Sequence, residues 1–80
     1  MTDSLLLNRL IKESGLRKEV LAAALGISLN SLNNKIANRT SFYADELYHL
    51  KVLLNLSQEQ FFEVFFASKV SDSDTSEGRA

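Results

Sequence analysis

Apolar residues recur every three or four positions along most of the chain, and the strict alternation typical of strands is nearly absent. This spacing places the apolar side chains on one face of a helix. Polar and glycine-containing breaks divide the pattern into five segments, at about residues 4–14, 17–25, 29–37, 44–54 and 58–68. The chain contains no proline that would interrupt these segments. We therefore predict an all-α fold of five helices.

Residues with capping chemistry mark the ends of these segments. Asp3 or Ser4 can cap the first helix, and Gly15 stands where a glycine often ends a helix in the left-handed conformation. Ser57 and Gln60 have the spacing of a capping box, which is the best helix start in the chain. The predicted boundaries therefore rest on side-chain chemistry as well as on periodicity.

The composition indicates one small domain followed by a tail. A chain of 80 residues with 45% hydrophobic residues is typical of a single domain. Residues 71–80, SDSDTSEGRA, are polar and acidic and have no apolar anchor. We expect a domain over residues 1–70 and a disordered acidic tail over residues 71–80. Such a tail is typical of a chain terminus and not of a linker to a second domain.

The residue inventory also argues against several classes of protein. There is no cysteine and only one histidine, His49, so disulfides, thiolate metal sites and multi-histidine metal sites are not expected. No apolar run approaches the roughly 20 residues of a membrane span, and the first ten residues lack the basic region of a signal peptide. Nucleotide-binding glycine motifs and GxSxG are missing. We expect no enzyme activity, no cofactor and no small-molecule substrate.

Charge is distributed unevenly although the net charge is only −1. Residues 9–39 carry six basic and two acidic side chains, whereas residues 40–70 carry two basic and four acidic ones. The asymmetry is either ordinary surface scatter or a basic face that meets a polyanion.

The most informative stretch is residues 17–37, RKEVLAAALGISLNSLNNKIA, in which two short helical segments flank a turn at Gly26. Glycine tolerates the positive φ of a tight turn, and the small Ala22 allows the two helices to approach closely. Apolar inner faces are supplied by Leu21, Leu25, Ile27, Leu32 and Ile36.

This pattern, LxxxVLAAALGISxxSL, resembles the helix-turn-helix of the lambda-repressor-like family, in which LAxxLGVSxxTI is common. The resemblance covers about residues 5–66, and the C-terminal part is similar to short Cro-like or repressor-like proteins of phages of Gram-positive bacteria. Two positions depart from the family pattern. Arg17 stands where a capping Ser or Thr is usual, and Lys18 stands where a phosphate-contacting Gln is usual.

The resemblance implies a five-helix DNA-binding domain with its helix-turn-helix at helices two and three. It implies a transcriptional regulator, such as a phage or prophage repressor, that binds a pseudo-palindromic double-stranded DNA operator as a homodimer. The expected location is the cytoplasm of a bacterial host, at the nucleoid, without membrane contact.

The third predicted helix carries an unusual number of amides. On a helical wheel the arc of Asn30, Asn33 and Asn34 is centred about 90° from Leu29. An Asn amide presents a donor and an acceptor that match N6 and N7 of adenine. The alternative is an ordinary solvated helix face.

With the resemblance, the predicted DNA site has two parts. The base-contacting residues are Leu29, Asn30, Asn33 and Asn34, with Leu29 placed to touch a thymine methyl. The phosphate-contacting residues are Arg17, Lys18, Ser28, Lys35, Asn38, Arg39 and Thr40. For Lys35 the alternative is a surface lysine, and for Asn38 it is a helix end.

Residues 61–66, FFEVFF, spread apolar side chains over about 200° of a helical wheel, which is wider than the roughly 100° of an ordinary amphipathic helix. Some of these rings either wrap around the core edge or meet a partner. We expect a homodimer interface formed by Phe62, Phe65 and Phe66. An alternative function is a protein-interaction module, such as an antirepressor-like phage protein, that uses the same fold without specific DNA binding.

Overall fold

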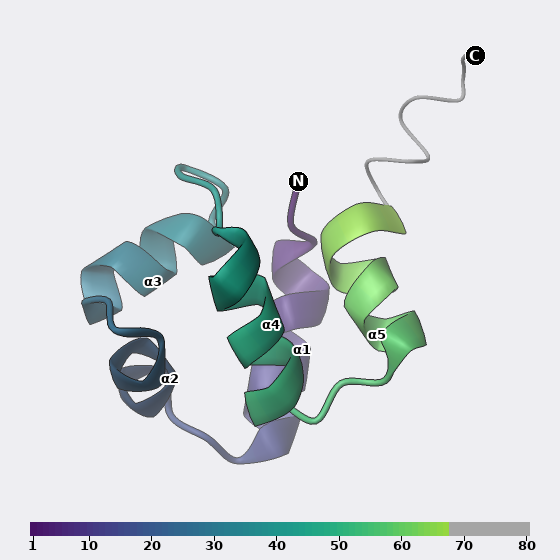
Figure 1. Cartoon of the computed structure of the whole chain (residues 1–80), viewed down its shortest axis with the longest axis horizontal. Helices are drawn as coiled ribbons and strands as arrows, with labels where there is room; N and C mark the ends of the chain where they lie inside the picture. Colours follow the sequence, from purple (N-terminus) through teal and green to yellow (C-terminus); the bar gives the residue numbers. More distant parts are fainter. Residues whose placement is uncertain (68–80) are drawn as a thin grey trace.

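The computed structural model describes residues 1–67, and this part of the chain is helical and contains no strand. The helices are α1 Ser4–Ser14, α2 Lys18–Leu25, α3 Leu29–Ile36, α4 Ala44–Leu53 and α5 Gln58–Phe62, and α5 continues into a π-helix, η1, Glu63–Ala67. In Figure 1, α2 and α3 lie on one side, α5 and η1 on the other, and α1 and α4 between them. The prediction of an all-α fold with five helices is confirmed for this part. The predicted tail, the boundary at residue 70 and the predicted end of the fifth helix lie outside the described residues.

Two of the predicted caps are confirmed by side-chain hydrogen bonds. The Asp3 carboxylate accepts the backbone N–H of Leu6 at 3.1 Å. Ser57 and Gln60 form the reciprocal capping box, with distances of 3.0 and 2.9 Å. These bonds satisfy helix N–H groups that have no partner within the helix, so the chain itself defines where α1 and α5 begin.

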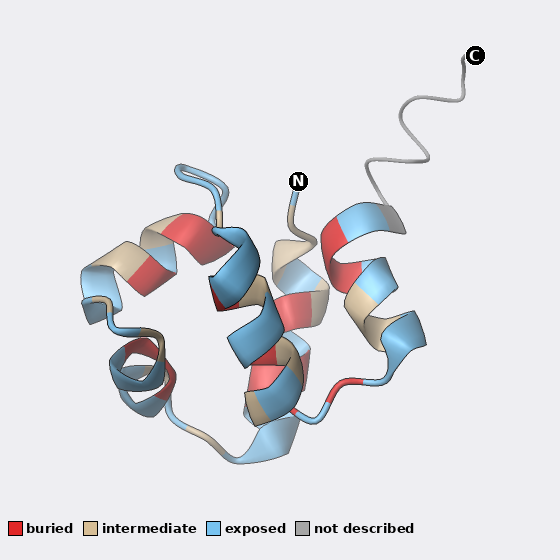
Figure 2. Cartoon of the chain, in the orientation of Figure 1, coloured by how far each residue is buried: buried red, intermediate tan, exposed pale blue. Residues whose placement is uncertain are grey.

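One fully buried side chain from each of five elements meets at the centre of the domain. These residues are Leu7, Leu21, Leu32, Leu50 and Val64, from α1, α2, α3, α4 and η1. The buried positions on α1 to α4 and on η1 accordingly face the interior (Figure 2). The packing places α2 against both α3 and α4, and α1 against α3 and η1. The core therefore fixes the orientation of α3 relative to the rest of the domain.

Left-handed residues end three of the helices in the same way. After α2, Gly26 has φ +76°, and Ile27 N–H donates to Ala22 O at 3.0 Å. After α3, Asn38 has φ 66° and Arg39 N–H donates to Asn34 O at 2.9 Å. Asn55 takes the same role after α4, with φ 53°. Each is the pattern in which a left-handed residue lets the next N–H reach back over a whole helical turn.

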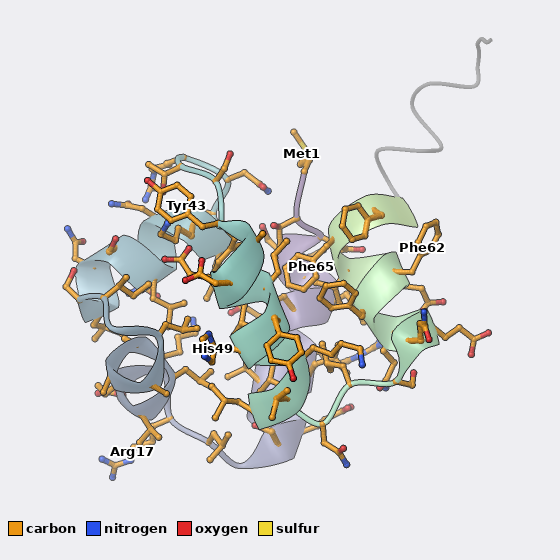
Figure 3. The ribbon with its side chains drawn as sticks, viewed as in Figure 1. Met1, Arg17, Tyr43, His49, Phe62 and Phe65 are labelled. Atoms are coloured by element: carbon orange, nitrogen blue, oxygen red, sulfur yellow. The ribbon has the colours of Figure 1, made fainter. Side chains whose placement is uncertain are left out.

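The three phenylalanines predicted to form a dimer interface differ in burial. Phe65 is only 5% exposed and packs edge-on against Phe42, with ring centroids 5.8 Å apart. Its assignment to a dimer interface is wrong. On a regular wheel Phe65 already stands on the side of Phe61 and the buried Val64, whereas Phe62 and Phe66 stand toward the other end of the apolar arc. Phe62 and Phe66 are 47% and 39% exposed, and Figure 3 shows Phe62 on the outer side and Phe65 on the inner side.

Candidate nucleic-acid interface

The exposed face of α3 carries two amides with no protein partner. Asn30 and Asn33 are exposed, and within residues 1–67 neither side chain takes part in a hydrogen bond. Leu32 and Ile36, on the opposite face, are buried and attach the helix to the core. Both amides therefore stand on a rigid support with their donors and acceptors directed to solvent.

Leu29 belongs to this exposed face and not to the core. It is the first residue of α3 and is 37% exposed, although the wheel places it beside Leu32 and Ile36. Ser28, just before it, accepts the backbone N–H of Ser31 at 3.0 Å and caps the helix. The Ser28 hydroxyl keeps its own proton, which can still be donated to an anion.

Asn34 has a different environment from the other two amides. It is half-buried, and its Oδ1 accepts a hydrogen bond from Arg39 Nη1 at 3.1 Å. Its backbone oxygen accepts the Arg39 N–H as well. Asn34 thus orients the Arg39 guanidinium beside α3, while its NH₂ group remains able to donate.

Lys35 is not a phosphate-contacting residue, and it is not a surface lysine either. It is 6% exposed, and its Nζ donates to Glu46 Oε1 and to Ser41 O, both at 3.0 Å. The ring centroid of Tyr43 lies 4.4 Å from the same nitrogen. Lys35 lies on the inner face of α3, where an ammonium group needs acceptors, and the first turn of α4 and the loop before it supply one each.

Asn38 stands at the end of α3, which is the second of the two roles predicted for it. Its side chain bonds to the N-terminal segment. Nδ2 donates to Thr2 O at 2.8 Å and to Ser4 Oγ at 3.3 Å, and Oδ1 accepts the Thr2 N–H at 2.9 Å. The amide therefore ties the N-terminal segment to the end of α3. This engagement removes the Asn38 side chain from the predicted phosphate-contacting set.

The remaining basic side chains flank α3 at two separate places. Arg17 and Lys18 stand at the start of α2, and Arg39 is exposed on the loop between α3 and α4, next to the exposed Thr40. Figure 3 shows Arg17, at the start of α2, far from that loop. The Arg17 guanidinium only donates hydrogen bonds, so it cannot cap the N–H groups at the start of α2, and α2 has no side-chain cap. Glu19 is the one acidic residue between residues 17 and 40. The electrostatic character of this surface is mildly positive.

Residues 1–67 contain no candidate metal site. No group of three or more His, Cys, Asp or Glu side chains in this part is placed to hold a metal ion. His49 is exposed on α4, and its Nδ1 lies 2.7 Å from the backbone oxygen of Asp45. None of the helices over these residues has the length and apolar character of a membrane span.

Comparison with protein-family models, with curated proteins and with solved structures finds no match to this chain. The function of the α2–α3 surface is therefore argued from its own geometry.

Proposed function

We propose that the protein is a sequence-specific DNA-binding transcriptional regulator, of the phage or prophage repressor or Cro-like kind. In this proposal α2 and α3 act as a helix-turn-helix, and α3 enters the major groove of a pseudo-palindromic operator. The observation that carries the proposal is the pair of exposed, unbonded amides of Asn30 and Asn33 on a helix fixed by Leu32 and Ile36. Base readout requires such polar groups on a rigid support.

The chemistry of this face favours A·T base pairs. An Asn amide pairs bidentately with adenine through N6 and N7, and Leu29 offers an apolar contact for a thymine methyl. Within residues 29–36 there is no arginine, the usual reader of guanine. We therefore expect an operator half-site with adenines under Asn30 and Asn33.

Phosphate contacts come from both sides of α3 in this proposal. Arg17, Lys18 and Ser28 belong to the α2 side, and Arg39 and Thr40 to the loop side. Contacts of this kind set the register of the protein on the duplex without reading its sequence. Because the basic residues are few, one domain alone would bind weakly, and a second subunit supplies the missing affinity.

The surface that we assign to the homodimer is formed by Phe62 and Phe66. Both rings are partly exposed, and their centroids lie 6.2 Å apart. They belong to the α5–η1 side of the domain, away from α2 and α3 (Figure 1). A two-fold dimer through this surface leaves both copies of α3 free to meet half-sites about 34–36 Å apart.

Base readout is tested with an operator selected from random-sequence DNA by the wild-type protein. The variant Asn30→Ala plus Asn33→Ala is expected to lose about 1–3 kcal/mol of discrimination for each bidentate amide–adenine pair. Asn8→Ala, an exposed asparagine on α1, is the matched control and keeps the preference. An unchanged base preference in the double variant contradicts the assignment.

A protein-interaction module is the second candidate function, and the exposed Phe62 and Phe66 favour it. Salt distinguishes the two functions. The logarithm of a DNA-binding constant falls with the logarithm of salt concentration by about 0.9 for each neutralised phosphate, whereas a contact between aromatic rings is nearly insensitive to salt.

Sedimentation of Phe62→Glu beside Val52→Glu, an exposed apolar control on α4, tests the dimer surface. A wild-type protein that stays monomeric at high concentration removes the homodimer from the proposal.

A further inference from the structure

A buried ion pair joins α3 to the start of α4 and holds the loop between them. Lys35 Nζ donates to Glu46 Oε1 and to the backbone oxygen of Ser41, each at 3.0 Å. The same Glu46 oxygen accepts the backbone N–H of Tyr43 at 2.9 Å. Both charged side chains are 7% exposed. The pair therefore fixes the backbone of the loop at two positions, residues 41 and 43.

Stability alone is a weak explanation for a charged pair at this place. Removing two charges from water is costly, and apolar replacements of a buried pair are often neutral or stabilising. An apolar pair cannot form hydrogen bonds, whereas this pair forms one with the backbone of Ser41 and one with the backbone of Tyr43, both in the loop. What the pair adds, and an apolar pair of the same volume lacks, is a defined loop position.

The loop held in this way carries Arg39 and Thr40. Its path leaves α3 at the left-handed Asn38, and the Arg39 guanidinium lies against Asn34 Oδ1 at 3.1 Å. On the other side, the bonds to Ser41 and Tyr43 define where the chain re-enters α4. The position of Arg39 and Thr40 relative to the outer face of α3 is thus set from both ends.

We propose that Lys35 and Glu46 are positioning residues for DNA recognition. They do not touch DNA; they place Arg39 and Thr40 against the phosphates that flank the bases read by α3. This inference rests on the proposed function. It means that the buried charge of Lys35 contributes to DNA recognition indirectly, through the position of the loop.

The test compares wild type with the variant Lys35→Met plus Glu46→Leu, which removes both charges together and leaves no buried charge alone. The variant is expected to fold, and the amides of residues 39–43 are expected to exchange faster with solvent. The salt slope of DNA binding is expected to fall by about 1 for each phosphate that the loop no longer neutralises. Arg39→Ala is expected to weaken DNA binding in wild type and to have little further effect in the double variant.

The matched control is Arg9→Met plus Glu13→Leu, which removes an exposed pair on α1 whose charged atoms are 4.0 Å apart. It likewise removes one positive and one negative charge, leaves the net charge at −1 and should leave the dependence on Arg39 intact. If the Lys35 and Glu46 variant does not fold, Lys35→Arg keeps the charge and displaces Ser41, and it should also weaken the effect of Arg39→Ala.

The possible failures are distinguishable. A wild-type protein that binds no DNA overturns both this inference and the proposed function. A wild type that binds DNA, together with a folded variant whose salt slope and loop exchange are unchanged, overturns the positioning role alone.

Discussion

The two flanks of the domain are held by different kinds of interaction. On the α2–α3 flank, directional hydrogen bonds supplement the apolar core at the turn at Gly26, the helix end at Asn38 and the pair of Lys35 with Glu46. On the α5–η1 flank, ring packing dominates, and Phe61 and Phe65 lie 5.2 Å apart between centroids. Directional bonds fix angles and positions, whereas apolar packing tolerates adjustment. A helix that reads base edges needs the first property, and a surface that pairs with a second copy can use the second.

In most proteins charged side chains are exposed and large apolar side chains are buried, and each flank departs from one half of this rule. The α3 flank buries a lysine, and the α5–η1 flank leaves Phe62 and Phe66 partly exposed. Buried polar groups and exposed aromatic groups are the informative exceptions to that rule. Lys35 lies beneath the surface proposed to meet DNA, and Phe62 and Phe66 lie on the surface proposed to meet a second subunit.

The largest expected effect tests the packing of the α5–η1 flank. Phe65→Ala should lower the free energy of unfolding by about 3–5 kcal/mol, because it empties a buried ring site. Phe66→Ala should cost about 1 kcal/mol, because that ring is partly exposed already. Urea denaturation of both variants measures the difference. Equal losses would show that the two rings share one environment, against the inward placement of Phe65.

Sequence reasoning succeeds in this domain where the determining interaction is local. The capping box of Ser57 and Gln60 and the glycine at position 26 act within one or two helical turns, so their spacing is enough. Lys35 fails that condition, because its partner Glu46 is eleven positions away and meets it only after α3 and α4 pack. Phe65 was assigned wrongly for another reason: the apolar arc of its segment is about 200° wide, and only packing, as against Phe42, determines which part of that arc faces the core.

Of the candidate site, the sequence located the outer face of α3 and misjudged several of its neighbours. The exposure of Asn30 and Asn33 was predictable, because the apolar stripe of α3 defines the buried face and they lie away from it. The engagement of Asn38 with Thr2 was not, because it joins segments 36 positions apart. Short polar side chains near helix ends bond to whatever backbone the fold brings close, and only the packed structure determines which backbone that is.

An intermediate effect is expected at the turn that joins α2 to α3. Gly26→Ala should lower stability by about 1–2 kcal/mol, because a side chain disfavours the left-handed conformation. An added Cβ meets no atom within 4 Å, so steric contact adds nothing to this cost. Gly15→Ala, with φ +78° and equally open surroundings, is the matched control and should cost a similar amount.

The two glycine variants then separate stability from recognition. Only Gly26→Ala alters the junction that orients α3, so only it should weaken DNA binding beyond the loss expected from unfolding. A mobility shift at a temperature where both variants are fully folded makes this comparison. Equal binding by the two variants would mean that the junction does not control the direction of α3.

The smallest expected effect concerns the two left-handed asparagines, Asn38 and Asn55. Both conformations suit glycine, so Asn55→Gly should stay within about 0.5 kcal/mol of wild type. Asn38→Gly also gives up the hydrogen bonds to Thr2 and Ser4, which are exposed and should be worth about 1 kcal/mol together. Thermal unfolding measures the pair, and amide exchange at Thr2 reports the broken tie directly. The contrary outcome is that Asn38→Gly and Asn55→Gly unfold at the same temperature and that the Thr2 amide exchanges in Asn38→Gly as slowly as in wild type. In that case the side chain of Asn38 does not hold the N-terminal segment, and polar bonds matter less to the α2–α3 flank than its geometry indicates.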